Sequence, residues 1–383
     1  MKKLPSQKPV ICVVGARPNF MKMAPILRAF SSHVPVIPVL LVHTGQHYDK
    51  DMSDRLFEDL QLPKPDINLE VGSASHAIQT SEVMRRFEPI LDENDPSCVL
   101  VVGDVNSTLA CTLVAVKKHV PVAHVEAGLR SHDRSMPEEI NRILTDQIAD
   151  KLYTTERNAE GNLHLEGIPS ARICFVGNVM IDTLKFSQKI ARSASDTLSS
   201  YGISPDILSG KNGYGVVTLH RPSNVDEKET LSKLVDDLSL ISKKLPLIFA
   251  LHPRTRGNLE KFDLLRAIDT NKIVLLPPQG YLEMIGLMSN AALVLTDSGG
   301  LQEETTALGV PCITLRENTE RPITIEQGTN TLVGTDHDAI MNCVNQVLAG
   351  NGKKGRMPEL WDGHAAERIA ADLWTWISSF PQN

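Results

Sequence analysis

The sequence has few aromatic residues and no long apolar run. Phe, Trp and Tyr make up 4% of its 383 residues, although hydrophobic residues as a whole reach 42%. No stretch approaches the roughly 18 consecutive apolar residues that a membrane-spanning helix needs. The start, "MKKLPSQKPV", is positively charged but lacks the apolar segment of a secretory signal. We therefore expect a globular protein of the cytoplasm.

Cysteine and net charge are equally unremarkable. The six cysteines are widely separated, and no two of them form a C-x-x-C pair, which favours buried, reduced thiols over disulfides or a metal site. The formal net charge of -7 excludes a general attraction to nucleic acid or to anionic membranes. Any anionic ligand must therefore be held by local groups.

Several motifs of common enzyme classes are missing. No predicted strand is followed by the G-x-G-x-x-G fingerprint of dinucleotide-binding folds, and neither the P-loop motif G-x-x-x-x-G-K-[ST] nor the nucleophile motif G-x-S-x-G occurs. His and Cys residues do not show the spacing of a zinc site. These absences disfavour nicotinamide redox chemistry, ATP hydrolysis and metal-dependent hydrolysis. We predict no cofactor and no metal.

Short apolar runs alternate with longer segments of helical period. The runs "VICVVG" and "CVLVVG" belong to the first half; the pattern pauses near residue 178 and restarts with "GVVTLH". Such alternation predicts parallel sheets covered by helices on both faces, and the length exceeds that of one core. We predict an α/β fold of two Rossmann-like, doubly wound domains that face each other across a cleft. Residues 1–178 form the first and 179–362 the second, and a last helix in 363–383 packs back on either one.

The stretch "DSGGLQEE", residues 297–304, directly follows the apolar run "AALVLT". Ligands of open parallel sheets bind at the carboxyl ends of the strands. The N–H groups of Gly299 and Gly300 can approach a phosphate there, and the following helix supplies partial positive charge. Ser298 is then a phosphate donor and Glu304 an acceptor for ribose hydroxyls. The alternative is a tight strand–helix turn without a ligand.

A second strand end carries cations. In "GARPNFMKMAP", residues 15–25, Pro18 suits the first helical position, which puts Arg17 and Lys22 near the start of a helix. Cations there oppose the helix dipole. An anion shared by both side chains explains them, whereas the alternative is solvated surface.

Three carboxylates occupy related places in successive strand–helix units. Asp104 ends "VLVVGD", Glu126 ends "VPVAHVE" and Glu138 lies in the first turn of "PEEINRIL". Asp104 or Glu126 alone is equally explained as a helix cap or a buried ion-pair partner. Glu138 alone is explained by a favourable charge at a helix N-terminus, and it is spaced i,i+4 to Arg142, a common stabilising pair. Together they indicate an acidic crevice.

The second half places basic groups at its strand ends. They occur in "LHRPSNVD", in "LHPRTRGN" and in "RENTERP", so we expect a cleft that is acidic on one wall and cationic on the other. The residues concerned are His220, Arg221, His252, Arg254, Arg256, Arg316 and Arg321, with Glu320 among them.

The motifs in sequence order resemble one family. "GARPNFMKMAP", "TGQHYD", "VVGDVNSTLA", "HVEAGLRS", "MPEEINR", "LHRPSNVD", "DSGGLQEE" and "RENTERP" resemble the non-hydrolysing UDP-N-acetylglucosamine 2-epimerases over nearly the whole chain. The resemblance implies a GT-B-like fold, a homodimer, and UDP held chiefly by the C-terminal domain. It also implies interconversion of UDP-GlcNAc and UDP-ManNAc for polysaccharide biosynthesis.

The resemblance also implies roles for individual residues. The catalytic set is Asp104, Glu126, Glu138 and His220. The resemblance and the basic strand ends of the second half together give the substrate-binding set. Its members are Arg17, Lys22, Arg142, Arg221, His252, Ser298, Gly299, Gly300, Glu304 and Arg321. Gln46 and His47 match part of a site at which some bacterial members bind a second UDP-GlcNAc as an activator.

The low acidity of the C2 proton of GlcNAc limits the possible mechanisms. The C2 proton of GlcNAc has no neighbouring carbonyl, so C2 inversion requires either a redox cofactor or cleavage of the bond to UDP. With no dinucleotide fingerprint, we expect loss of UDP to give 2-acetamidoglucal, followed by re-addition, with an acid and a base among the carboxylates and His220. Alternatives are an epimerase of a UDP-2,3-diacetamido uronic acid, a hydrolysing epimerase, a GT-B glycosyltransferase, and a UDP-sugar-binding regulator without turnover.

Overall fold

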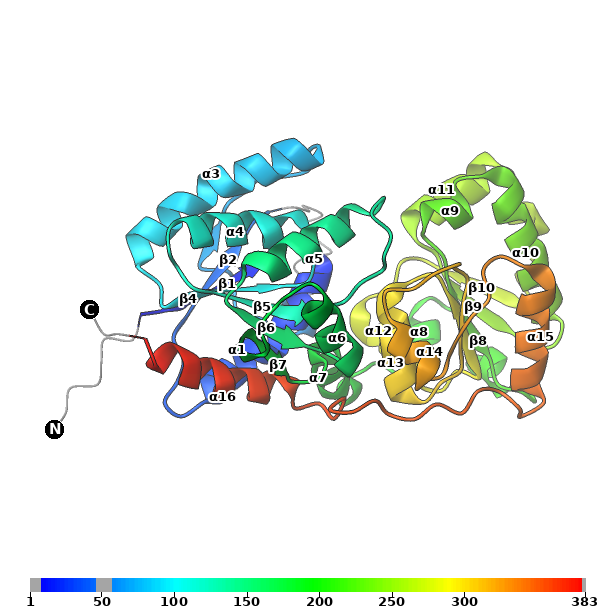
Figure 1. The fold of residues 1–383 in the computed structure, drawn as a ribbon. Coiled ribbons are helices and arrows are strands. Elements are labelled where there is room, and N and C mark those ends of the chain that lie inside the picture. The colour runs from blue at the N-terminus through cyan, green and yellow to red at the C-terminus, as the bar shows by residue number, and fades with distance from the viewer. Residues whose placement is uncertain (1–7, 46–56, 381–383) are drawn as a thin grey trace. The chain divides into compact units, whose positions relative to one another are not determined.

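The computed structural model describes residues 8–45 and 57–380, and the chain divides into two compact units. Unit 1 comprises residues 1–185 together with 359–383, and unit 2 comprises residues 186–358. Figure 1 shows the fold of each unit as a ribbon. Within the described residues, none of the helices has the length and apolarity needed to cross a membrane.

Unit 1 is built on a seven-stranded parallel sheet with the order β3-β2-β1-β4-β5-β6-β7. Its strands β1 and β4 are buried along their whole length, as expected for strands covered on both faces. The strands are β1 (Val10–Val14), β2 (Val39–His43), β3 (Ile67–Asn68), β4 (Cys98–Val102), β5 (Val122–Ala127), β6 (Lys151–Thr154) and β7 (Ile173–Phe175).

Helices cover both faces of this sheet. Figure 1 shows α3 (His76–Asn94), α4 (Asn106–Lys117) and α5 (Pro137–Ile148) on one face, and α1 (Arg17–Ser32) packed beside α16 (Ala365–Ser378) on the other. Two further α-helices among the described residues of this unit are α6 (Arg157–Leu165) and α7 (Val179–Gln188), the last of which crosses the boundary to unit 2.

The C-terminal helix belongs to unit 1 because buried contacts hold it there. The carboxylate of Asp182 on α7 accepts the backbone N–H groups of Ala365 and Ala366, which lie in the first turn of α16. Just before the helix, the fully buried Trp361 donates its indole N–H to the carbonyl of Thr155. These bonds satisfy donors that a helix N-terminus otherwise leaves unpaired.

Unit 2 repeats the architecture with a six-stranded parallel sheet of order β10-β9-β8-β11-β12-β13. The strands are β8 (Gly215–Thr218), β9 (Leu247–Ala250), β10 (Ile273–Leu276), β11 (Leu293–Thr296), β12 (Cys312–Thr314) and β13 (Asn330–Leu332). Neighbouring strand residues face opposite sides of a sheet. Accordingly Val217 and Leu295 join one buried apolar cluster, and Val216 and Val294 join another.

The helices of unit 2 lie on both sides of the sheet. In Figure 1, α8 (Ala194–Ser200), α12 (Tyr281–Ser289) and α13 (Gly299–Leu308) lie on one side, and α10 (Lys228–Ser242) and α15 (His337–Leu348) on the other. The other α-helices of this unit are α9 (Pro222–Val225), α11 (Pro253–Lys261) and α14 (Pro322–Glu326).

The predicted α/β class with two doubly wound sheets is therefore confirmed. The sequence did not reveal the short strands β3, β6 and β13, which have two, four and three residues. All six cysteines are free, and four of them are buried. Burial raises the pKa of the Cys312 thiol to about 11, so this group is an inert part of the core.

Both sheets have a topological switch point, where the chain order of the strands reverses. In unit 1 it lies between β1 and β4, and in unit 2 between β8 and β11. The crevice outside the carboxyl ends of such strands is the usual ligand site of open parallel sheets. Ligand-binding residues are therefore expected in the loops after these four strands.

Candidate functional site

Lys22 and Glu126 form a buried ion pair at the switch point of unit 1. Lys22 lies on α1, directly after β1, and its ammonium contacts the carboxylate of Glu126, with side-chain exposures of 8% and 3%. Glu126 is near the end of β5 in a left-handed conformation with φ 73°, where the register between β5 and β6 shifts. Such a bulge re-aims a side chain, and a non-glycine residue held there marks a functional candidate.

Gly103 makes room for this pair. Its φ is +68°, and a Cβ at this position would lie 2.9 Å from Lys22 Nζ and 3.4 Å from Glu126 Oε2. Asn19 supports the same spot, because its amide donates to the carbonyl of Val102 at 2.7 Å and its oxygen accepts the N–H of Ala16 at 2.9 Å. The loops after β1 and β4 are thereby held together.

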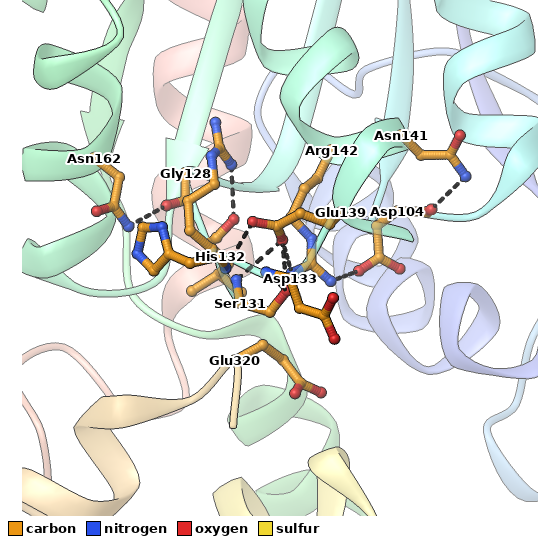
Figure 2. A network of polar contacts seen from close by, with 12 residues as sticks. Asp104, Gly128, Ser131, His132, Asp133, Glu139, Asn141, Arg142, Asn162 and Glu320 are labelled. Carbon is orange, nitrogen blue, oxygen red and sulfur yellow. Dashed lines mark hydrogen bonds and ion pairs between the residues drawn. The ribbon is translucent and has the colours of Figure 1, made fainter. Parts of the chain in front are cut away.

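Asp104 follows Gly103 and is fixed by a second ion pair. Its Oδ2 accepts a bond from Arg142 Nη2 at 2.5 Å, and Arg142 Nη1 contacts Glu139 at 2.8 Å (Figure 2). Asn141 holds the backbone by donating to the Asp104 carbonyl at 2.9 Å. Arg142 and Asn141 both lie on α5, so this helix positions Asp104 after the end of β4.

Glu139 is the structural acid of this group. It is 1% exposed and also accepts N–H groups from Ser131 and His132. Burial raises the pKa of Glu139, but the bonds from Ser131 and the charge of Arg142 outweigh it and leave this pKa below its ordinary value. Glu139 therefore remains a carboxylate that keeps the Arg142 side chain in place.

Glu138 and Arg17 do not take part in the ion pairs of Asp104 and Glu126. The expected i,i+4 pair between Glu138 and Arg142 is wrong, because Arg142 is occupied by Asp104 and by Glu139 at i,i+3. Among the described residues Glu138 has no ion-pair partner, and it is half-buried in the first turn of α5. Arg17 begins α1 and is exposed. We expected Arg17 and Lys22 to share an anion. In the structure Lys22 contacts the carboxylate of Glu126 instead.

In unit 2, a buried aspartate organises the loop after β8. Asp297 directly follows β11 and has no exposed surface, and its carboxylate faces His220 Nδ1 at 2.8 Å. The same carboxylate accepts the backbone N–H groups of His220 and Arg221. Burial raises the pKa of Asp297, yet the contacts with His220 and the backbone bonds lower it below the ordinary value. The residue is thus a fixed anion at the switch point.

The N-terminus of α13 lies beside this aspartate. Ser298 is the N-cap residue, but its side chain does not cap the helix, and its N–H donates to Thr296 Oγ1 at 3.0 Å. A Cβ on Gly299 would lie 2.5 Å from Glu320 Oε1, whereas a Cβ on Gly300 would meet nothing within 4 Å. Glu304, predicted to meet ribose, is buried on the same helix.

Arginines and a glutamate surround the same helix end. Glu320 contacts Arg316 at 2.9 Å and Arg221 at 3.8 Å. Although burial raises the pKa of Glu320, the charges of Arg321 and Arg316 dominate and lower it to about 2. Arg321 itself pairs with Glu303 at 2.9 Å. The cationic set expected from "RENTERP" is thus present and is partly neutralised by Glu320.

The remaining predicted residues have simpler surroundings. His252 is exposed, accepts the N–H of Arg254 at the start of α11 at 3.2 Å, and lies 5.6 Å from His220, ring centre to ring centre. Gln46 and His47 lie outside the described residues. Among the residues that are described, no group of three or more His, Cys, Asp or Glu side chains is arranged to hold a metal ion.

The comparison with known proteins identifies the family. A family model described as UDP-N-acetylglucosamine 2-epimerase matches residues 32–373. The chain belongs to this family. A UDP-N-acetylglucosamine 2-epimerase of Methanococcus maripaludis is 43% identical over 342 residues, which are 88% of this chain and 91% of the relative.

Two further epimerases are nearly as similar. A UDP-2,3-diacetamido-2,3-dideoxy-D-glucuronate 2-epimerase of Pseudomonas aeruginosa is 41% identical, over 95% of this chain and 99% of its own. The crystal structure of Methanocaldococcus jannaschii UDP-GlcNAc 2-epimerase in complex with UDP-GlcNAc and UDP matches with a TM-score of 0.83 and 41% identity, covering 96% of this chain and 99% of that one.

Sequence reasoning missed several residues that organise the site of this epimerase family member. Asp297, Glu139 and Asn19 hold His220, Arg142 and the loop after β1, respectively. A signal existed for Asp297, because it directly follows an apolar run and is separated from the two glycines only by Ser298. None existed for Glu139 over its neighbour Glu138, since both lie in the same helical turn.

Proposed function

We propose that this protein interconverts UDP-N-acetylglucosamine and UDP-N-acetylmannosamine. The observation that carries the proposal is the match to the epimerase family over residues 32–373, in a chain whose acids Asp104 and Glu126 lie at the switch point of the first sheet. Relatives with the same named activity, and the structure that contains UDP-GlcNAc and UDP, support the choice of substrate.

We propose that unit 2 holds the UDP part. The N–H groups at the start of α13 and the open space beside Gly300 suit a diphosphate, since a helix N-terminus with glycine allows close approach of an anion. Arg221 adds a cation, and Ser298 leaves its hydroxyl free of capping. Such preorganised donors stabilise the negative charge that develops on the departing UDP.

The acids of unit 1 act on the sugar ring of the substrate. Elimination breaks the C1–O bond and removes the C2 proton, giving 2-acetamidoglucal and UDP; re-addition returns a proton to the opposite face of C2. Asp104 and Glu126 each face a cation, so both are anions that can accept a proton and stabilise positive charge at C1. Glu138, without an ion-pair partner among the described residues, is the candidate for returning one.

This chemistry requires that the acids of unit 1 and the UDP-binding residues of unit 2 contact the same substrate molecule. The cleft predicted from the sequence would allow this. We propose that the domains close around the nucleotide, which excludes water from the glucal intermediate. His220, held by Asp297, is placed to assist the diphosphate or a proton transfer.

An assay with UDP-GlcNAc as the sole substrate tests the function. We expect NMR to show UDP-ManNAc accumulating to an equilibrium mixture without added cofactor, metal or acceptor. Free ManNAc would indicate a hydrolysing enzyme, and consumption of an added acceptor would indicate a glycosyltransferase. No turnover of UDP-GlcNAc, together with turnover of a UDP-2,3-diacetamido uronic acid, would transfer the assignment to that substrate.

Two sequence-based expectations are part of this proposal. The protein is expected to be cytoplasmic, as its substrate is a nucleotide sugar, and to form a homodimer. Sedimentation equilibrium tests the second, since a single species of one chain mass, 42.1 kDa, would contradict it.

A further inference from the structure

His124 is a buried histidine that the proposed chemistry does not use. It lies on β5, two residues before Glu126, and none of its surface is exposed. Both of its ring nitrogens have close partners. Nδ1 lies 2.7 Å from Asp146 Oδ1, and Nε2 lies 2.8 Å from the carbonyl oxygen of Gly103.

Both partners of His124 are hydrogen-bond acceptors. A backbone carbonyl has no proton to donate. Asp146 already accepts the N–H of Gly128 at 3.0 Å and contacts Arg130 Nη1 at 2.8 Å, so it is a carboxylate. Burial raises the pKa of Asp146, but the contacts with His124 and Arg130 outweigh this and lower it. Each ring nitrogen of His124 must therefore carry a proton.

The surrounding charges balance. The buried cations are His124 and Arg130, and Arg130 also donates through Nε and Nη2 to Glu166 at 2.7 and 2.6 Å. Two cations thus face two carboxylates, Asp146 and Glu166. A buried ion needs such pairing and full hydrogen bonding to be retained in the interior.

The bond to Gly103 connects this network with the acids. The Gly103 carbonyl belongs to the peptide whose nitrogen is that of Asp104, and the N–H of Gly103 donates to the carbonyl of Val125 at 3.0 Å. We propose that His124 is a positioning residue, an imidazolium held by Asp146 that fixes the Gly103–Asp104 peptide and so orients the Asp104 carboxylate. The effect on turnover rests on the proposed function, whereas the charge of His124 does not.

The charge is tested on the wild-type protein. In a ¹⁵N-histidine-labelled sample at neutral pH, we expect the His124 ring to show two protonated nitrogens, assigned by the signal lost in His124→Gln. In Asp146→Asn, which removes the carboxylate, the same ring is expected to show a neutral tautomer. A neutral ring in the wild type would overturn the proposal, whether or not the protein is an epimerase.

The positioning is tested by kinetics. We expect His124→Gln to lower kcat about 100-fold because a small displacement of a catalytic group has this effect. The loss of a buried cation is expected to lower the melting temperature, so kcat and UDP affinity are compared below the melting transition, where UDP affinity is expected to be retained. His164→Gln, at an exposed histidine on α6, is the matched control and is expected to keep wild-type kcat. Wild-type kcat in His124→Gln would overturn the positioning role. If the wild type itself has no epimerase activity, the proposed function fails, and the NMR result still decides the charge of His124.

Discussion

His220 donates its Nδ1–H to the carboxylate of Asp297 across 2.8 Å. The carboxylate is itself held in place, because it also accepts the backbone N–H groups of His220 and of Arg221. Since Nδ1 is occupied and the His220 side chain is 39% exposed, Nε2 is the nitrogen available to a substrate. A carboxylate that fixes the tautomer and orientation of a histidine is a recurrent device of enzyme active sites.

We therefore predict that Asp297→Asn lowers kcat about 100-fold, because the amide of asparagine presents a donor as well as an acceptor to the ring and no longer selects one tautomer. The measurement is kcat together with UDP affinity. Asp226→Asn, which changes an aspartate paired with Arg254 in the same unit, is the control and is expected to keep its rate. Unchanged turnover in Asp297→Asn would remove the histidine from the mechanism.

Asp104→Asn and Glu126→Gln test the two acids of unit 1. Each substitution keeps the size of the side chain but removes its basicity, so we expect losses of about 10²–10⁴-fold in kcat. UDP affinity is expected to be retained, because the residues proposed to bind UDP lie in unit 2. Glu88→Gln, at an exposed glutamate on α3, is the control, and thermal melting checks that Lys22 without its partner leaves the fold intact. A variant with wild-type rate would exclude its residue from catalysis.

Gly300→Ala separates a ligand role from a turn role at the start of α13. A Cβ at this position meets no atom within 4 Å, and alanine favours helices by about 1 kcal/mol over glycine. We therefore expect unchanged or slightly raised stability but weaker UDP binding, because the added methyl group occupies the space proposed for the diphosphate. Calorimetric titration with UDP is the measurement. Wild-type UDP affinity would mean that the glycine serves only the turn.

The buried Asp182 predicts a pH dependence of stability. Burial is the largest cause that raises its pKa, from 3.8 to about 6, although the N–H groups of Ala366 and Ala365 lower it. The folded protein therefore binds the proton more tightly than the unfolded chain. The stability that this proton contributes is complete below about pH 4 and is lost as the pH rises to about 6, with a total of roughly 3 kcal/mol.

Urea denaturation of the wild type and Asp182→Asn between pH 4 and 7 measures this effect. The wild type is expected to lose stability relative to the variant as the pH rises through this window, because asparagine does not titrate. Parallel stability curves for the two proteins would show that Asp182 does not titrate as its burial implies.

The sequence was a good guide wherever one strand-end pattern determined the local structure. Apolar runs such as "VICVVG" became buried parallel strands, and the residues chosen after them, Lys22, Asp104 and Glu126, lie at the switch point of the first sheet. Alternation of strands and helices is strongly periodic, and the position of a strand end follows from the pattern. Two doubly wound sheets could be predicted for this reason.

The sequence could not predict contacts that depend on tertiary packing. The left-handed backbone of Glu126 arises from a register shift between β5 and β6, which no local pattern encodes. Arg142 could pair with either neighbouring glutamate, and packing selects Glu139 because Ser131 and His132 also donate to it. The short strands β3, β6 and β13 are too brief to show a periodicity.

The most direct test of the account is the fate of the C2 hydrogen. When UDP-GlcNAc is incubated with the protein in D₂O without added NAD or metal, the UDP-ManNAc formed is predicted to carry deuterium at C2. The reason is that a base of the enzyme removes the C2 proton as UDP departs from C1, and a solvent-derived one returns to C2. UDP-ManNAc that quantitatively retains the original C2 hydrogen would contradict the elimination and re-addition of UDP.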